Sequence, residues 1–166
     1  MRKHKPHREQ MEHLRDLIKG IRVAMLTTVS DHGVLHSRPL ATQEVEPDGN
    51  LWFFTRKDSS KVFDLRKNSS VNVSYSDPEN DRYVSVAGHA ELIESKAKAR
   101  KLWSPSQTVW FPDGADDPYL MLLKVNVEQA QYWDHSAGKM VMFLALAKAY
   151  ITGERPKESP SNVIHI

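Results

Sequence analysis

A short polar segment, residues 58–61, has the residue types of a phosphate site. Asp58, Ser59, Ser60 and Lys61 follow the apolar run of residues 51–55 and precede a helical pattern. A helix that begins there offers free backbone N–H groups and the positive end of its dipole to an anion. A simpler interpretation is that Asp58 or Ser59 caps the helix while Lys61 is solvated. The segment alone is compatible with both interpretations.

Arg38 is a second candidate for binding an anion, because it lies in the extended segment of residues 36–40. Side chains alternate between the two faces of a strand, so Arg38 points to one defined face. Pro39 favours an edge strand, since proline cannot donate a ladder hydrogen bond. Arg38 therefore faces either solvent at an edge or an anion.

The eight histidines raise the question of a metal or haem site. His32 and His36 are four residues apart, but Gly33 and Pro39 exclude a helix that would place both rings on one face. In a strand, at ~3.3 Å per residue, the two rings would lie ~13 Å apart, too far to share a metal. The acidic residues of segment 113–117 lie among Pro and Gly, which is typical of turns. We therefore predict surface histidines and no metal site.

The composition excludes several classes of protein. Cysteine is absent from the 166 residues, so there is no disulfide, thiol nucleophile or thiolate ligand. The 23 Lys and Arg nearly balance the 21 Asp and Glu and are spread along the chain, without the basic stripe that nucleic-acid binding requires. No apolar run reaches the ~18 residues of a membrane span or forms a signal-peptide core. We expect a cytoplasmic protein, one domain over residues 1–166, with no nucleic-acid or membrane partner.

The elements that must position these residues are mostly strands. Helical patterns occupy residues 8–19, 61–67, 95–103 and 139–150. Alternating or β-branched and aromatic runs predict strands within residues 22–55, 70–93 and 119–133. Their connections are mostly a few residues long, which requires mostly antiparallel pairing, and few helices are present to cover the faces. We therefore expect the sheet to close as a barrel.

Two segments carry no regular pattern. Residues 104–118 hold many Pro, Gly and Asp residues together with aromatic side chains, so we predict a long loop. Residues 153–166 are polar, and we predict a mobile tail there. Trp103, Trp110 and Phe111 in or beside the loop either cover a ligand or bury the underside of the loop.

Five motifs in order resemble the FMN-binding split barrels related to pyridoxamine 5'-phosphate oxidase, and within them the bacterial general stress protein branch. The motifs are HSRPLA, LWFFT with the D-S-S-K helix start, RYVSVAGHAEL, LWSPSQTVWFPDGADDP and YWD. The resemblance covers about residues 10 to 155. It implies a mainly β fold, an antiparallel six-stranded split β-barrel with flanking helices. It also implies a homodimer that binds FMN or FAD in a cleft between subunits.

The resemblance assigns roles to individual residues. It implies that Arg38 and Lys61 contact the flavin phosphate, with hydroxyl and backbone donors from Ser59 and Ser60. Trp133 would reach the flavin of the partner subunit, although a buried aromatic explains it equally well. The residues implied along the isoalloxazine ring are Pro39, Leu40, Phe54 and Thr55.

Two departures from the family pattern limit the expected reaction. Tyr83 occupies the position where the vitamin oxidase branch has a glutamine that contacts the flavin ring, so that contact must change. The segment 157–166 lacks the basic, histidine-bearing motif that grips pyridoxal phosphate, so oxidation of pyridoxamine phosphate is not expected.

The expected function is that of a flavin-dependent oxidoreductase linked to stress responses, because a bound flavin carries out hydride or electron transfer itself. No catalytic acid or base is identified. One alternative is a flavin-binding sensor or storage protein without turnover. Another is a barrel that binds haem or a deazaflavin.

Overall fold

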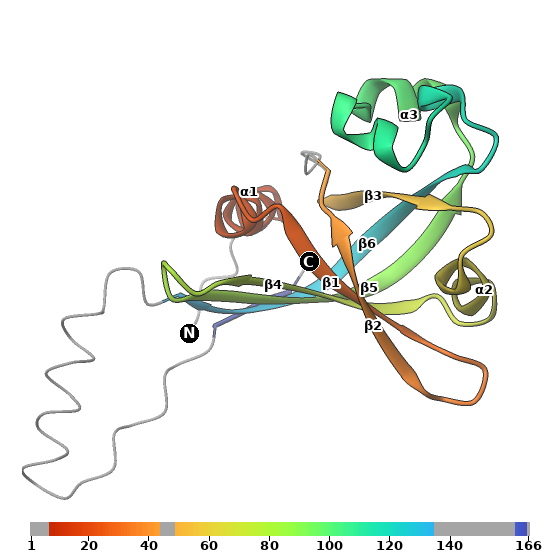
Figure 1. Ribbon diagram of the computed structural model, residues 1–166. Helices are drawn as coiled ribbons and strands as arrows, with labels where there is room; N and C mark the ends of the chain where they lie inside the picture. Colours follow the sequence, from red (N-terminus) through yellow and green to blue (C-terminus); the bar gives the residue numbers. More distant parts are fainter. Residues whose placement is uncertain (1–6, 44–48, 135–161, 166) are drawn as a thin grey trace, which may run out of the picture.

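The computed structural model describes residues 7–43, 49–134 and 162–165, and an antiparallel sheet forms its centre (Figure 1). The order of the strands is β2-β1-β4-β5-β6-β3, and β7 also pairs with β6. The strands are β1 (Val23–Val29), β2 (Leu35–Ala41), β3 (Asn50–Arg56), β4 (Ser70–Asp77), β5 (Arg82–Ile93), β6 (Leu120–Asp134) and β7 (Asn162–His165). The helices are α1 (His7–Ile18), α2 (Ser60–Lys67) and α3 (Lys96–Leu102), with 3₁₀ turns η1 (Pro105–Val109) and η2 (Gly114–Asp116).

The sheet is split between β2 and β3, the two ends of the strand order. These ends approach each other, and the Gln43 N–H donates to the Trp52 carbonyl at 3.1 Å just beyond β2. The mainly antiparallel split-barrel fold expected from the sequence is thus confirmed. The sheet has seven strands rather than six.

The additional strand corrects the expectation of an unstructured tail. Residues 162–165 form β7, whose Ile164 is buried opposite Ala130 of β6. The alternation of this short segment is visible in the sequence, but its partner strand is more than 25 residues away along the chain. The helix expected over residues 139–150 and the remainder of the tail lie outside the described residues.

Two apolar cores position β3. Leu51 and Phe53 pack into the main core inside the barrel, which one side of α1 closes. Trp52 and Phe54 point the other way, into a second core under α3 and the 3₁₀ turns. Because both faces of β3 are covered, its whole run Leu51–Thr55 is buried. The end of β3 is therefore fixed where the chain turns into α2.

A β-bulge bends the long pair β5 and β6. The register shifts between Ala87 and Gly88. A Cβ atom on Gly88 would lie 2.1 Å from the backbone oxygen of Asn126, so this close backbone approach requires glycine. Bulges increase local twist and allow strands to bend around a barrel. The bend allows β6 to pair with both β5 and β3 along its length.

Candidate functional site

A cavity of about 420 Å³ lies where β1, β2, β3, α2 and the η1 segment meet. This volume is within the range of small-molecule sites. Its apolar lining consists of Val23, Pro39, Leu40, Ala41, Phe54, Trp110 and Phe111. Its polar lining consists of Gln43, Thr55, Arg56, Ser59, Lys61 and Gln107. An apolar cavity with a few polar groups is the usual form of a ligand site.

The structure brings most of the sequence-predicted site residues together. The residues that line the cavity are Pro39, Leu40, Phe54, Thr55, Ser59 and Lys61. Arg38 lies beside the lining, close enough for its charge to act on Lys61. Ser60 is the exposed first residue of α2 and does not line the cavity. Tyr83 and Trp133 lie elsewhere.

The start of α2 leaves polar groups directed to the cavity. Ser59 is the N-cap residue, with φ −81° and ψ 149°, but its hydroxyl makes no capping bond and lies 3.3 Å from Thr55 Oγ1. Asp58 instead accepts two hydrogen bonds of 3.0 Å from Arg56, and this guanidinium lowers the pKa of the Asp58 carboxyl. The segment therefore does not use Asp58 or Ser59 as the side-chain cap of α2.

Lys61 is a half-buried cation on the cavity wall. Burial lowers the pKa of its ammonium, and the nearby Arg38 guanidinium lowers it further, while Asp58 partly opposes both effects. Among the described residues no carboxylate forms an ion pair with Lys61. A charge held in this way favours an anionic ligand, because the anion would compensate both the burial and the repulsion.

The guanidinium of Arg38 is mostly buried and contacts Thr28 and Asp64. Its Nη1 donates to Thr28 Oγ1 at 2.7 Å, and its Nη2 lies 3.5 Å from Asp64 Oδ2. Thr28 in turn donates to Asp64 at 2.9 Å, and Asp64 is buried. Sequence reasoning missed Thr28 and Asp64. The available signal was that Asp64 follows Lys61 by three residues on the same helix, which places both on one side.

The long segment 104–118 is more regular than predicted, because it contains η1 and η2. Its aromatic residues were expected either to cover a ligand or to bury the underside of the loop, and both arrangements occur. Phe111 is buried in the second core, where its ring lies 6.5 Å from that of Trp103, and it also lines the cavity. Trp110 is 66% exposed and lines the cavity as well. Sequence reasoning missed Gln107, because an irregular segment gives no periodicity from which to infer its direction.

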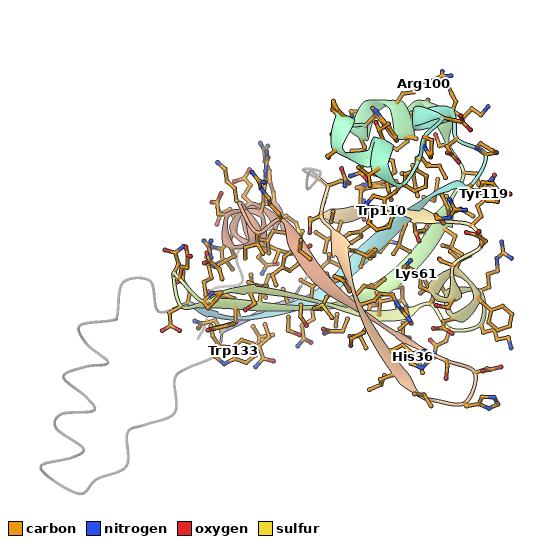
Figure 2. All side chains as sticks on the ribbon, in the orientation of Figure 1. His36, Lys61, Arg100, Trp110, Tyr119 and Trp133 are labelled. Atoms are coloured by element: carbon orange, nitrogen blue, oxygen red, sulfur yellow. The ribbon has the colours of Figure 1, made fainter. Side chains whose placement is uncertain are left out.

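Trp133 and Tyr83 lie opposite each other on β6 and β5. Figure 2 shows Trp133 at the lower left of the view, far from Lys61 and Trp110. Neither residue lines the cavity. Trp133 therefore cannot contact a ligand in the cavity of its own chain in this arrangement.

The histidines considered for a metal site lie near the β1–β2 hairpin. His32 is exposed, 3.7 Å from Asp31, and His36 Nδ1 lies 3.6 Å from Asp64 Oδ2. Within residues 7–43, 49–134 and 162–165, no group of three or more His, Asp or Glu side chains could hold a metal ion. None of the helices in these ranges is long and apolar enough to cross a membrane.

Comparisons with known proteins agree with the fold. The sequence model of the pyridoxamine 5'-phosphate oxidase like family matches residues 9–157. General stress protein 26 of Bacillus subtilis is 33% identical over 117 residues, which cover 68% of this chain and 80% of that protein. Protein bli-3 of Neurospora crassa is 26% identical over 159 residues, which cover 90% of this chain and 76% of that protein.

A solved structure shows the same arrangement. The general stress FMN/FAD binding protein of Xanthomonas citri is 30% identical, with a TM-score of 0.65, over 76% of this chain and 89% of that one. The family model spans most of the chain, and the similarities to the relatives cover most of their lengths. The chain therefore belongs to the pyridoxamine 5'-phosphate oxidase-like family.

Proposed function

We propose that the cavity binds a flavin nucleotide, FMN or FAD, and that the protein is a flavin-dependent oxidoreductase. The observation that carries the proposal is the Lys61 ammonium at the start of α2, which has no ion-pair partner among the described residues and lies on a cavity that also has an apolar wall. A flavin nucleotide has the matching chemistry, with an anionic phosphate and a flat, largely apolar ring. The similarity to an FMN/FAD binding protein supports the proposal.

The residues present fit both ends of such a ligand. Lys61, the Ser59 hydroxyl and the N–H groups at the start of α2 would hold the phosphate. The apolar side chains of β2 and β3, among them Leu40 and Phe54, would lie along the ring. Arg38 would act on the phosphate with its charge, while it keeps its bonds to Thr28 and Asp64.

The flavin would supply hydride or electron transfer, and the protein would supply binding, orientation and access. Among the described residues that line the cavity, only Arg56 and Lys61 carry a charge, and none is His, Asp or Glu. This observation also favours a second candidate, a flavin-binding sensor or storage protein without turnover. Steady-state oxidation of NAD(P)H by the flavin-loaded protein separates the two. Turnover supports the oxidoreductase, whereas tightly bound flavin without turnover supports the carrier.

The binding proposal is tested with Lys61→Ala and two ligands, FMN and riboflavin, which lacks the phosphate. A charge-assisted contact contributes about 1.5 to 3 kcal/mol, so FMN should bind about 10- to 100-fold more weakly while riboflavin binds unchanged. Lys67→Ala is the matched control, because Lys67 lies on the same helix but pairs with Asp31 and does not line the cavity. Fluorescence titration of the flavin-free protein measures both affinities. Unchanged FMN affinity in Lys61→Ala would contradict the phosphate assignment.

We further propose that the protein acts as a homodimer. One outer face of the sheet supports this, since the register of β1, β2, β4, β5 and β6 places uncharged side chains side by side there. They include Val23, Met25, Leu35, Tyr83 and Trp133, with Ser, Thr, Asn and Gln between them. Depletion of charge is typical of the centre of protein interfaces.

A further inference from the structure

We propose that Gln107 and Trp110 recognise the ring of the bound nucleotide, so that they set selectivity for a flat heterocycle with a hydrogen-bonding edge. The inference rests on the flavin function proposed above and deepens it. It is carried by the side chains of Gln107 in η1 and of Trp110, the C-cap residue of η1, which line the same cavity. One of them is the amide of Gln107, a residue only 8% exposed, and the other is the indole of the exposed Trp110.

The side-chain amide of Gln107 has no hydrogen-bond partner within the part of the chain that the structure describes. The residue is only 8% exposed and lines the cavity. Its backbone is satisfied, because its N–H donates to Ser104 and its carbonyl accepts from Trp110 and Phe111, each at 3.0 Å. Its side-chain amide makes no hydrogen bond with another described residue. The amide atoms are still accessible from the cavity. A ligand that excluded water from them without pairing with them would lose about 1 to 3 kcal/mol, whereas a ligand that pairs with them avoids that loss.

The isoalloxazine ring has the edge that such an amide can pair with. Its pyrimidine part carries carbonyl oxygens and an N–H group, and a glutamine amide offers both an acceptor and donors. An aliphatic or purely hydrocarbon ring would leave the amide unpaired. The Gln107 side chain therefore discriminates by the cost of an unsatisfied polar group, which is the stronger form of selectivity.

Trp110 offers a flat surface beside this amide. Its indole is 66% exposed although it borders the apolar lining of the cavity, so a ligand ring against it would remove apolar area from water. The backbone N–H of Trp110 donates to the backbone carbonyl of Gln107, which holds the two residues in one turn.

The turn is itself anchored. Phe111 is 2% exposed, and its ring lies 6.2 Å from that of Phe54 in the second core. Pro105 fixes the backbone at the start of the turn, where its missing N–H is not needed. The two recognition residues are thus held by a rigid support, which reduces the entropy lost when a ring binds.

Neither Gln107 nor Trp110 carries a charge, so their contribution should not depend on the phosphate. Gln107→Leu and Trp110→Ala should each weaken the binding of riboflavin and the binding of FMN by the same factor, about 10-fold. Lys61→Ala, in contrast, should weaken the binding of FMN alone. Trp110→Ala should also raise the fluorescence of bound flavin, because a stacked indole quenches it. Val109→Ala is the control, since Val109 is 80% exposed on the same turn and does not line the cavity. Titration of the flavin-free proteins with each ligand gives the affinities.

The outcomes separate this inference from the proposed function. If the wild-type protein binds flavin and both variants keep its riboflavin affinity, the inference is wrong while the proposed function stands. A loss confined to FMN would also overturn it. If the wild-type protein binds neither ligand, the proposed function fails and the inference with it.

A second variant covers the case in which Gln107→Leu does not fold, as judged by circular dichroism. Gln107→Glu keeps the shape of the side chain and brings a negative charge to the ring. Because reduced flavin carries more negative charge than oxidised flavin, the reduction potential of bound flavin should become more negative. An unchanged potential in a folded Gln107→Glu protein that binds flavin would contradict contact with the ring.

Discussion

Asp64 determines how the positive charge around the cavity is distributed. Its buried carboxylate accepts a hydrogen bond from Thr28 and lies 3.5 Å from Arg38. The charge of Arg38 is therefore largely compensated by the protein itself, whereas Lys61 has no such partner among the described residues. Two cations that are equivalent in the sequence thus have different roles. Arg38 links β2 to α2, and Lys61 remains available to a ligand.

This difference predicts separate effects on stability. Arg38→Ala leaves the buried Asp64 carboxylate without its cation and should lower the free energy of unfolding by about 3 kcal/mol. Arg38→Ala combined with Asp64→Asn removes both charges and should recover at least half of that loss. Chemical denaturation of the flavin-free proteins measures both values. Equal stability of Arg38→Ala and the double variant would contradict the assignment of this loss to the unpaired Asp64 carboxylate.

The lowered pKa of Lys61 predicts a pH dependence of FMN binding. Burial and Arg38 hold this pKa below the ordinary 10.5, so the ammonium loses its proton at a lower pH than a solvated lysine. A bound phosphate would stabilise the ammonium and raise its pKa, so binding on the alkaline side takes up a proton. FMN affinity should therefore fall as the pH rises from neutral towards 10.5.

Riboflavin provides the reference for this measurement, because any titration of the ring affects both ligands alike. Above pH 7 the FMN phosphate is already mostly in its doubly charged form, since the second pKa of a phosphate monoester is about 6. The ratio of FMN to riboflavin affinity should decline with pH in the wild-type protein and stay level in Lys61→Ala. A ratio that does not vary with pH in the wild-type protein would count against Lys61 as the phosphate ligand.

At the scale of elements, the sequence predicts those helices and strands that are determined by a local residue pattern. The helical spacing of residues 61–67 and the apolar run 51–55 identify α2 and β3, and with them Thr55, Ser59 and Lys61 at the junction. These residues could be placed because a strand end and a helix start fix the direction of their neighbours.

The remaining parts of the site depend on tertiary contacts. Phe111, just after η1, packs in the second core, and no periodicity within residues 104–118 shows that Gln107 lines the cavity. The Arg38–Asp64 pair joins residues 26 positions apart, on a strand and a helix whose relative position the sequence does not give. β7 depends in the same way on a distant partner in β6.

At the scale of the whole molecule, the uncharged outer face of the sheet continues to the rim of the cavity. Val23, Pro39 and Ala41 share this face, since Val23 pairs with Ala41 and Met25 with Pro39, and all three also line the cavity. Trp133 lies on the same face at the far end of β6. A second copy packed on this face would therefore border the cavity, and its own Trp133 could lie where this chain's Trp133 cannot.

The homodimer proposal makes a prediction about linkage between flavin and association. If Trp133 of a second copy completes the cavity, mass action requires that flavin tighten the dimer by the same factor that dimerisation tightens flavin binding. Trp133→Ala should weaken both flavin binding and the effect of flavin on association, and should leave the fold intact, because this side chain is only partly buried.

Phe63→Ala is the control, since Phe63 is 58% exposed on α2, away from the sheet face. Analytical ultracentrifugation of the flavin-free and flavin-loaded forms over a dilution series measures the effect. If both forms dissociate at the same concentration, or if a monomer binds flavin fully, the cavity is complete within one chain and Trp133 has no part in it.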